Sequence, residues 1–219
     1  MGSNGGNAVT IGLTINGLDD VRKMVGGIPE TVDRASAVAI NEAITFGQAE
    51  SSRRIREQVA FKASYIGNAT DPGARLRVAK KARVGDLTGI ISGRHRPTSL
   101  AQFEQGAKLG KGGYVRVKVS ATGGSKRIPG AFPIKLRRGN GVYDAENANE
   151  GIAVRLNKDG ELPAGLNKKS AVNVSGSLYL LYGPSVDQVF RDVRFDVQGP
   201  VGDALESSFL RNFGRLNRG

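Results

Sequence analysis

His95 is the only histidine of the 219-residue chain, so a Ser-His-Asp triad would have to use it. Its two neighbours in sequence, Arg94 and Arg96, would disfavour the imidazolium form that such a triad needs. Cysteine is absent, which excludes a thiol nucleophile, a thiolate metal cluster and a disulfide scaffold. The sequence therefore predicts a surface histidine and no enzymatic activity.

A glycine-rich run over residues 106–112 superficially resembles a phosphate-binding loop. It reads Gly-Ala-Lys-Leu-Gly-Lys-Gly, so the interval between its first two glycines is one residue too short. Gly112 also stands where a Ser or Thr would bind magnesium. The acidic groups, including Asp19 and Asp20, match no calcium-loop spacing. We expect no cofactor, no metal site and no small-molecule substrate.

The net charge of +12 is concentrated in one part of the chain. Residues 53–138 hold 20 Lys and Arg against four acids, whereas the rest holds 12 against 16. This segregation predicts one basic surface that faces nucleic acid, an acidic protein ring or an acidic lipid face, although a solvated surface that aids solubility is the plainer interpretation. Aromatic residues do not interleave with the cations in a stacking pattern, so any contact with nucleic acid would be sequence-independent.

Hydrophobic periodicity predicts the elements that would present this charge. Residues 8–15 alternate as a strand, residues 18–25 suit a short helix, and a long helix is expected from Pro29 to Ala60. The apolar stripe of the long helix is rich in alanine, which allows a neighbouring element to approach closely. The stripe includes Val32, Ala35, Ala39, Ala43 and Phe46.

Residues 75–80, 87–91 and 114–119 alternate between apolar and polar positions, as in antiparallel strands with one solvated face. That face would be basic. The candidates for contact with DNA in a channel or with an acidic partner are Arg75, Arg77, Lys80, Lys81, Arg116 and Lys118.

The second half of the chain is less regular. Residues 106–113 suggest a mobile hairpin or extended loop, residues 128–134 a strand with an embedded turn, and residues 178–182 a short strand. Two helical stretches are expected after Ser185, broken around Gly199-Pro200.

These elements predict an α+β fold in which a long N-terminal helix and a C-terminal helix pack on a small antiparallel β-sheet, with extended loops. Residues 1–16 would be an N-terminal arm or edge strand, and residues 17–219 a single domain. Within that domain, a polar loop excursion is expected at about residues 139–177, outside the core.

Two short runs stand out, Arg-Ile-Pro-Gly-Ala-Phe at residues 127–132 and Tyr-Gly-Pro-Ser at residues 182–185. Together they resemble the phage minor tail protein Z family, the tail completion proteins of siphophages and related prophages. The similarity extends over roughly Val32 to Arg215 and includes the early Ala-rich helix and a basic strand. Both runs are also consistent with turns that only specify the fold, with proline fixing φ and glycine allowing positive φ. The motif and interface candidates are Arg127, Ile128, Pro129, Gly130, Ala131 and Phe132, followed by Tyr182, Gly183, Pro184 and Ser185.

The resemblance implies a tail-completion-like fold and a structural virion protein. Such a protein completes the head-proximal end of the tail as a ring around the DNA channel, enabling head-tail joining and DNA delivery. Its expected partners are further copies of itself in a hexameric ring, other neck and tail proteins, and non-specifically contacted DNA, but no membrane. It would be assembled in the host cytoplasm and located in the virion. The alternative is a cellular, sequence-independent nucleic-acid-binding protein with a basic sheet face.

Overall fold

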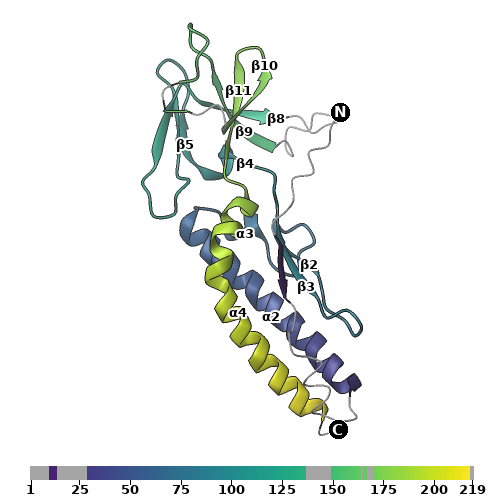
Figure 1. Ribbon diagram of the computed structural model, residues 1–219. Coiled ribbons are helices and arrows are strands. Elements are labelled where there is room, and N and C mark those ends of the chain that lie inside the picture. The colour runs from purple at the N-terminus through teal and green to yellow at the C-terminus, as the bar shows by residue number, and fades with distance from the viewer. Residues whose placement is uncertain (1–9, 14–28, 137–148, 164, 167–169, 218–219) are drawn as a thin grey trace. The chain divides into compact units, whose positions relative to one another are not determined.

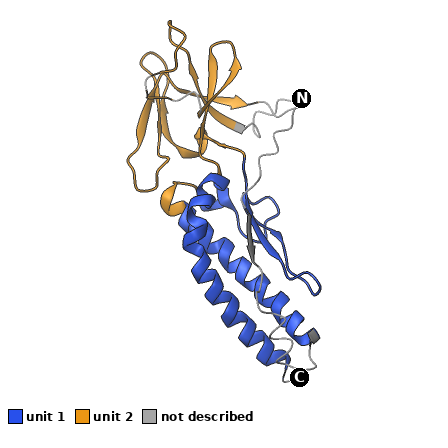
Figure 2. Cartoon of the chain, in the orientation of Figure 1, with its two compact units in different colours: residues 1–55, 63–95, 186–219 blue, residues 56–62, 96–185 orange. Residues whose placement is uncertain are grey.

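The computed structural model describes residues 10–13, 29–136, 149–163, 165–166 and 170–217 (Figure 1). The chain forms two compact units rather than the expected single domain (Figure 2). Unit 1 comprises residues 1–55, 63–95 and 186–219, and unit 2 comprises residues 56–62 and 96–185. The physical reason is that the strands after residue 96 bury their apolar faces against one another and so form a second core.

Unit 1 is built on two long helices, α2 (Pro29–Gln58) and α4 (Val186–Leu216). The long helix expected from Pro29 is confirmed, and Ala35, Ala39 and Ala43 are fully buried along it. Phe46 differs from the expectation, because it is 44% exposed. The close approach instead occurs at Gly47, where an added Cβ would lie 2.9 Å from Cγ2 of Val201.

Helix α4 continues through Pro200, so the predicted break at Gly199-Pro200 is wrong. Proline inside a helix costs about 3 kcal/mol because it lacks an N–H and crowds the preceding turn. Val197 and Val201 are buried on either side of this position, in one cluster with Ala43 of α2. Each buried aliphatic side chain contributes about 1.5–3 kcal/mol, which is enough to offset the proline.

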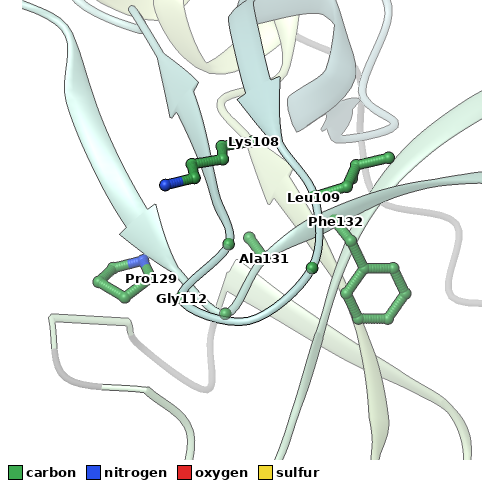
Figure 3. Close-up of a pocket in the computed structure, with 9 residues that line it drawn as sticks. Lys108, Leu109, Gly112, Pro129, Ala131 and Phe132 are labelled. Carbon is green, nitrogen blue, oxygen red and sulfur yellow. The ribbon is translucent and has the colours of Figure 1, made fainter.

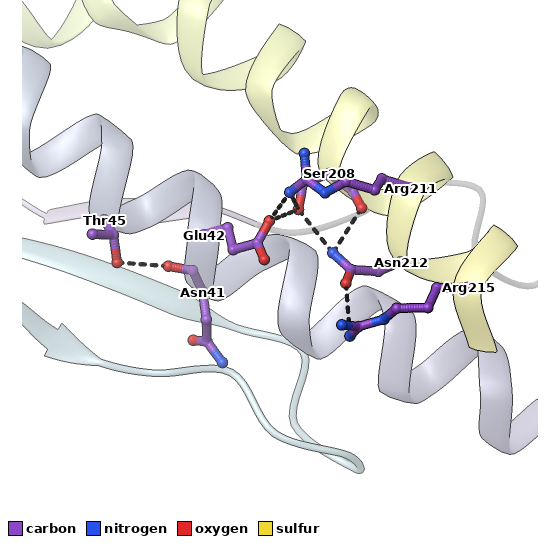
Figure 4. Close-up of polar contacts among 7 residues, drawn as sticks. All are labelled: Asn41, Glu42, Thr45, Ser208, Arg211, Asn212 and Arg215. Carbon is purple, nitrogen blue, oxygen red and sulfur yellow. Dashed lines mark hydrogen bonds and ion pairs between the residues drawn. The ribbon is translucent and has the colours of Figure 1, made fainter.

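Polar contacts join α2 to the C-terminal half of α4 (Figure 4). The Ser208 hydroxyl donates a hydrogen bond to the carboxylate of Glu42, and Arg211 forms an ion pair with the same carboxylate. Asn212 Nδ2 donates to the Ser208 carbonyl at 2.9 Å. The pKa of the Glu42 carboxyl is lowered, chiefly by the hydrogen bond from Ser208. Because Ser208 and Asn212 are buried, these contacts favour one alignment of the two antiparallel helices.

A three-stranded antiparallel sheet completes unit 1, in the order β1-β3-β2. Its strands are β1 (Thr10–Leu13), β2 (Leu76–Lys80) and β3 (Gly89–Gly93), and the short helix α3 (Ala63–Ile66) precedes β2. The sheet packs on α2 at Gly89, where an added Cβ would lie 2.7 Å from Cγ2 of Ile44. The helix expected over residues 18–25 lies outside the described residues.

Unit 2 contains two antiparallel sheets, β5-β6-β7 and β10-β11-β9-β8, and the short β4 pairs with the end of β11. A 3₁₀ turn at Leu100–Phe103 links β4 to β5. The strands are β4 (Thr98–Ser99), β5 (Glu104–Lys108), β6 (Tyr114–Val117), β7 (Lys126–Pro129), β8 (Phe132–Leu136), β9 (Asn149–Arg155), β10 (Ala171–Ser175) and β11 (Leu178–Gly183).

The predicted excursion over residues 139–177 is wrong in one important part. Strand β9 lies inside it, pairs with β8 on one side and β11 on the other, and has Ile152, Ala153 and Val154 fully buried. A short apolar run is typical of a strand covered on both faces, but the polar residues around this one concealed it. The α+β class with antiparallel sheets is confirmed. No helix in the described ranges is long and apolar enough to cross a membrane.

A candidate anion-binding face in unit 2

Strand β6, in the middle of the sheet β5-β6-β7, places its apolar and basic side chains on opposite faces. Val115 and Val117 of β6 are buried, so Arg116 between them lies on the other face. Strand register places Arg116 opposite Arg127 of β7, and Tyr114 opposite Lys108 of β5. Lys118 continues the alternation beyond β6. We call this set the basic face, and it consists of Lys108, Arg116, Lys118 and Arg127.

The positive charge of the basic face is not neutralised within the described part of the chain, where none of its four cations forms an ion pair with a carboxylate. Arg127 instead lies over the ring of Tyr114, with its guanidinium carbon 4.6 Å from the ring centroid. Like charges directly opposite each other, as at Arg116 and Arg127, destabilise a strand pair. An anion bound between them would relieve this repulsion, so the face is suited to an anionic partner.

Two glycine turns meet at one end of this sheet and line a pocket of about 390 Å³ (Figure 3). Gly112 in the β5-β6 turn and Gly130 in the β7-β8 turn both have φ of 70°, a conformation that favours glycine. The Gly130 amide donates to the Gly113 carbonyl at 2.9 Å, which fixes one turn against the other. Leu109, Pro129, Ala131 and Phe132 give the pocket an apolar wall, and Lys108 supplies a cation.

The structure divides the first predicted motif between core and surface. Ile128 and Ala131 are buried, whereas Arg127, Pro129 and Gly130 are exposed beside the basic face. The half-buried ring of Phe132 has the Arg155 guanidinium 5.9 Å from its centroid. The exposed part of this motif is therefore available to a partner, and the buried part specifies the fold.

The second motif is packed into the structure of unit 2. Tyr182 and Gly183 pair with β4, and Ser185 is buried. An added Cβ at Gly183 would lie 2.8 Å from Cε2 of Phe103. This run therefore has a clear folding role. The two motifs lie on strands that are not neighbours in the sheet, since β9 separates β8 from β11.

The remaining candidate cations lie in unit 1, on strand β2 or directly beside it. Arg75 is not a free surface cation: its guanidinium carbon lies 3.8 Å from the Tyr65 ring centroid and its Nη1 donates to the Tyr65 carbonyl at 2.8 Å. Lys80 forms an ion pair with Asp86 at 2.7 Å. Arg77 and Lys81 are exposed and border a pocket of about 410 Å³.

Sequence reasoning missed two members of the basic face. Lys108 lies in the glycine-rich run that failed as a phosphate loop, and Arg127 was identified only as a motif residue. The available signal was the alternation of β6, which indicates a basic face but does not show which strands flank it.

His95 is half exposed, but it is not an isolated surface residue. Its Nδ1 lies 3.1 Å from the carboxylate of Asp187, which is fully buried and also 3.1 Å from Arg191. This cluster connects the end of β3 to the first turn of α4. The described residues contain no group of three or more His, Cys, Asp or Glu side chains placed to hold a metal ion.

The resemblance to tail completion proteins rests on the two short sequence runs alone. No protein-family model matches this chain, and no match was found among curated proteins or solved structures.

Proposed function

We propose that this chain is a structural virion protein of a bacteriophage tail or neck. It would assemble as a ring around the DNA channel at the head-proximal end of the tail and enable head-tail joining and DNA delivery. The observation that carries the proposal is the basic face, whose four cations are not neutralised by the described residues and lie beside the exposed part of the first motif.

The geometry favours contact without sequence readout. Arg116 and Lys118 are half-buried, so they are held close to a sheet surface rather than extended into a groove. Cations in this arrangement attract phosphates through charge alone, and the binding weakens steeply with salt. A channel protein needs this property because DNA must pass through it without being retained.

The same face also suits an acidic protein neighbour. Pro129 and Gly130 are exposed at the edge of the basic face, next to the apolar pocket. A neck or tail protein that brings a carboxylate to Lys108 and an apolar side chain to Leu109 would contact motif and charge together. Electrostatic complementarity of this kind fixes orientation and accelerates encounter.

Charge reversal tests the proposal in the phage or prophage that encodes the chain. Arg116→Glu with Lys118→Glu, and separately Arg127→Glu, should lower the titre of infectious particles by about tenfold or more, the effect of losing about 1.4 kcal/mol of docking energy. The matched control is Lys126→Glu, because Lys126 adjoins Arg127 but lies opposite Val117, on the other face of the strand.

Two outcomes discriminate between the proposals. Wild-type titre and tail attachment with the double reversal would show that the basic face is a solubility device. A purified monomer that binds duplex DNA with a steep salt dependence, encoded where no phage genes occur, would favour the cellular nucleic-acid-binding alternative.

A further inference from the structure

The outer face of α4 carries exposed apolar side chains around a bare segment of helix. Phe195 is 65% exposed and Leu210 is 62% exposed, although the Arg194 guanidinium lies 4.6 Å from the Phe195 ring centroid. Between them, an added Cβ at Gly199 or Gly202 would meet no heavy atom within 4 Å. Spacings of four, three and eight residues place these four positions on one side of the helix. The opposite side carries the buried Val197 and Val201.

Carboxylates border this apolar face along its length, and all of them are exposed. Among the described residues they form no ion pair. In a chain with a net charge of +12, such a set indicates that the face is complementary to a cationic surface. The residues are Asp192, Asp196, Asp203 and Glu206.

The same unit carries a surface of matching character at the tip of the β2-β3 hairpin, residues 81–86. Val84 is 52% exposed at this tip, and Lys81 and Arg83 are exposed around it. The tip is held in shape by two backbone hydrogen bonds between Arg83 and Asp86, at 3.0 and 2.9 Å. It therefore presents a small apolar knob flanked by cations.

The hairpin tip and the outer face of α4 belong to different sides of unit 1. Asn41 of α2 binds the tip through two hydrogen bonds of 2.8 Å, to the amide and carbonyl of Ala82. Ala43, two residues further along α2, packs instead against Val197 of α4. Residues two apart on a helix point to nearly opposite sides. A tip therefore cannot reach the outer face of α4 in its own unit.

We propose that the outer face of α4 is the docking site for the hairpin tip of a second copy of this chain. Val84 of one copy enters the gap above Gly199 and Gly202 of the next, between Phe195 and Leu210. Lys81 and Arg83 meet the bordering carboxylates. Because each copy uses one tip and one α4 face, the contact is heterologous and repeats from copy to copy, closing into a ring where the rotation allows.

This inference rests on the proposed ring but uses none of the basic face. The oligomeric state tests the docking contact and the titre tests the basic face, so these two proposals can fail separately. Two charge-swapped variants of the full-length chain test it by native mass spectrometry. One carries Lys81→Glu and Arg83→Glu at the tip, and the other carries Asp203→Lys and Glu206→Lys on α4. Each alone should lose the oligomer, whereas an equimolar mixture should regain it, since every reversed surface then meets its complement.

The matched control is Asp159→Lys with Glu161→Lys, an equal charge change on an exposed loop of unit 2, which should leave the oligomer unchanged. Arg116→Glu with Lys118→Glu should also leave it unchanged. A wild-type chain that stays monomeric, single variants that still assemble, or a mixture that fails to assemble would each overturn the docking inference. None of these results would restore or remove the effect of the basic face on titre.

Cysteine pairing gives a second readout, because the chain has no native cysteine. Oxidation of Val84→Cys with Gly199→Cys should produce a ladder of cross-linked species, since a disulfide needs Cβ atoms about 3.5–4.5 Å apart. Val84→Cys alone gives at most dimers. Val84→Cys with Phe46→Cys, an exposed site on α2, should give no ladder. The same ladder from the Phe46 control, or no ladder from the Gly199 pair, would contradict the docking geometry.

Discussion

Replacing Gly47 by alanine should destabilise unit 1, although alanine is the better helix former. In an open helix position this change stabilises by about 0.8–1.0 kcal/mol. At Gly47 the new methyl group would lie 2.9 Å from Cγ2 of Val201 and 3.2 Å from Cδ1 of Ile91, both in the core. Val201 is β-branched and stiff in a helix, so it yields poorly. Overpacking of this kind costs about 1–3 kcal/mol, so we expect a net loss of about 1 kcal/mol.

The same substitution at Gly202 is the matched control, because an added Cβ there meets nothing within 4 Å. Gly202→Ala should stabilise by about 0.8–1.0 kcal/mol, which places the two variants about 2 kcal/mol apart. For a chain of this length the difference corresponds to about 4–8 °C in Tm, measured by the helical circular dichroism signal at dilution. A Gly47→Ala chain as stable as Gly202→Ala would refute the packing argument.

Three further predictions concern individual contacts in unit 1. Glu42 has a pKa below its ordinary 4.5, chiefly through the hydrogen bond from Ser208, so its contribution to stability is present above about pH 4.5 and is lost as the pH falls through the folded-state pKa; Glu42→Gln should flatten this part of an acid melting series. Asn41→Ala leaves two backbone groups of the hairpin tip unpaired and should cost about 1–3 kcal/mol, with faster amide exchange at the tip as the direct check. Arg75→Gln should lower Tm because it removes a stacked and hydrogen-bonded guanidinium. Arg77→Gln, at an exposed position, is the control and should change stability by less than about 0.5 kcal/mol. Equal shifts of Tm in the two variants would show that the Arg75 contacts add nothing to stability.

Sequence alone predicted the elements whose signal is local. Apolar and polar residues alternate in β6, which predicts a strand, and apolar residues recur three and four positions apart along α2, which predicts a helix. Both patterns depend only on residues close together in sequence. The buried and basic sides of β6 follow from the same alternation, because side chains alternate across any strand. For this reason Arg116 was identified as a candidate cation before any partner strand was known.

Tertiary structure decided whatever depends on residues distant in sequence. Pro200 predicts a helix end by its local chemistry. Helix α4 nevertheless continues past Pro200, because this part of the helix packs against Ala43 of α2. The sequence predicts a loop at β9, but the segment is a strand because it pairs with β8 and β11. The sequence likewise predicts a solvated cation at Arg75, but its guanidinium stacks on the Tyr65 ring. Only the strand register places Arg127 opposite Arg116. Local propensity does not encode this register, because the pairing energy arises between strands.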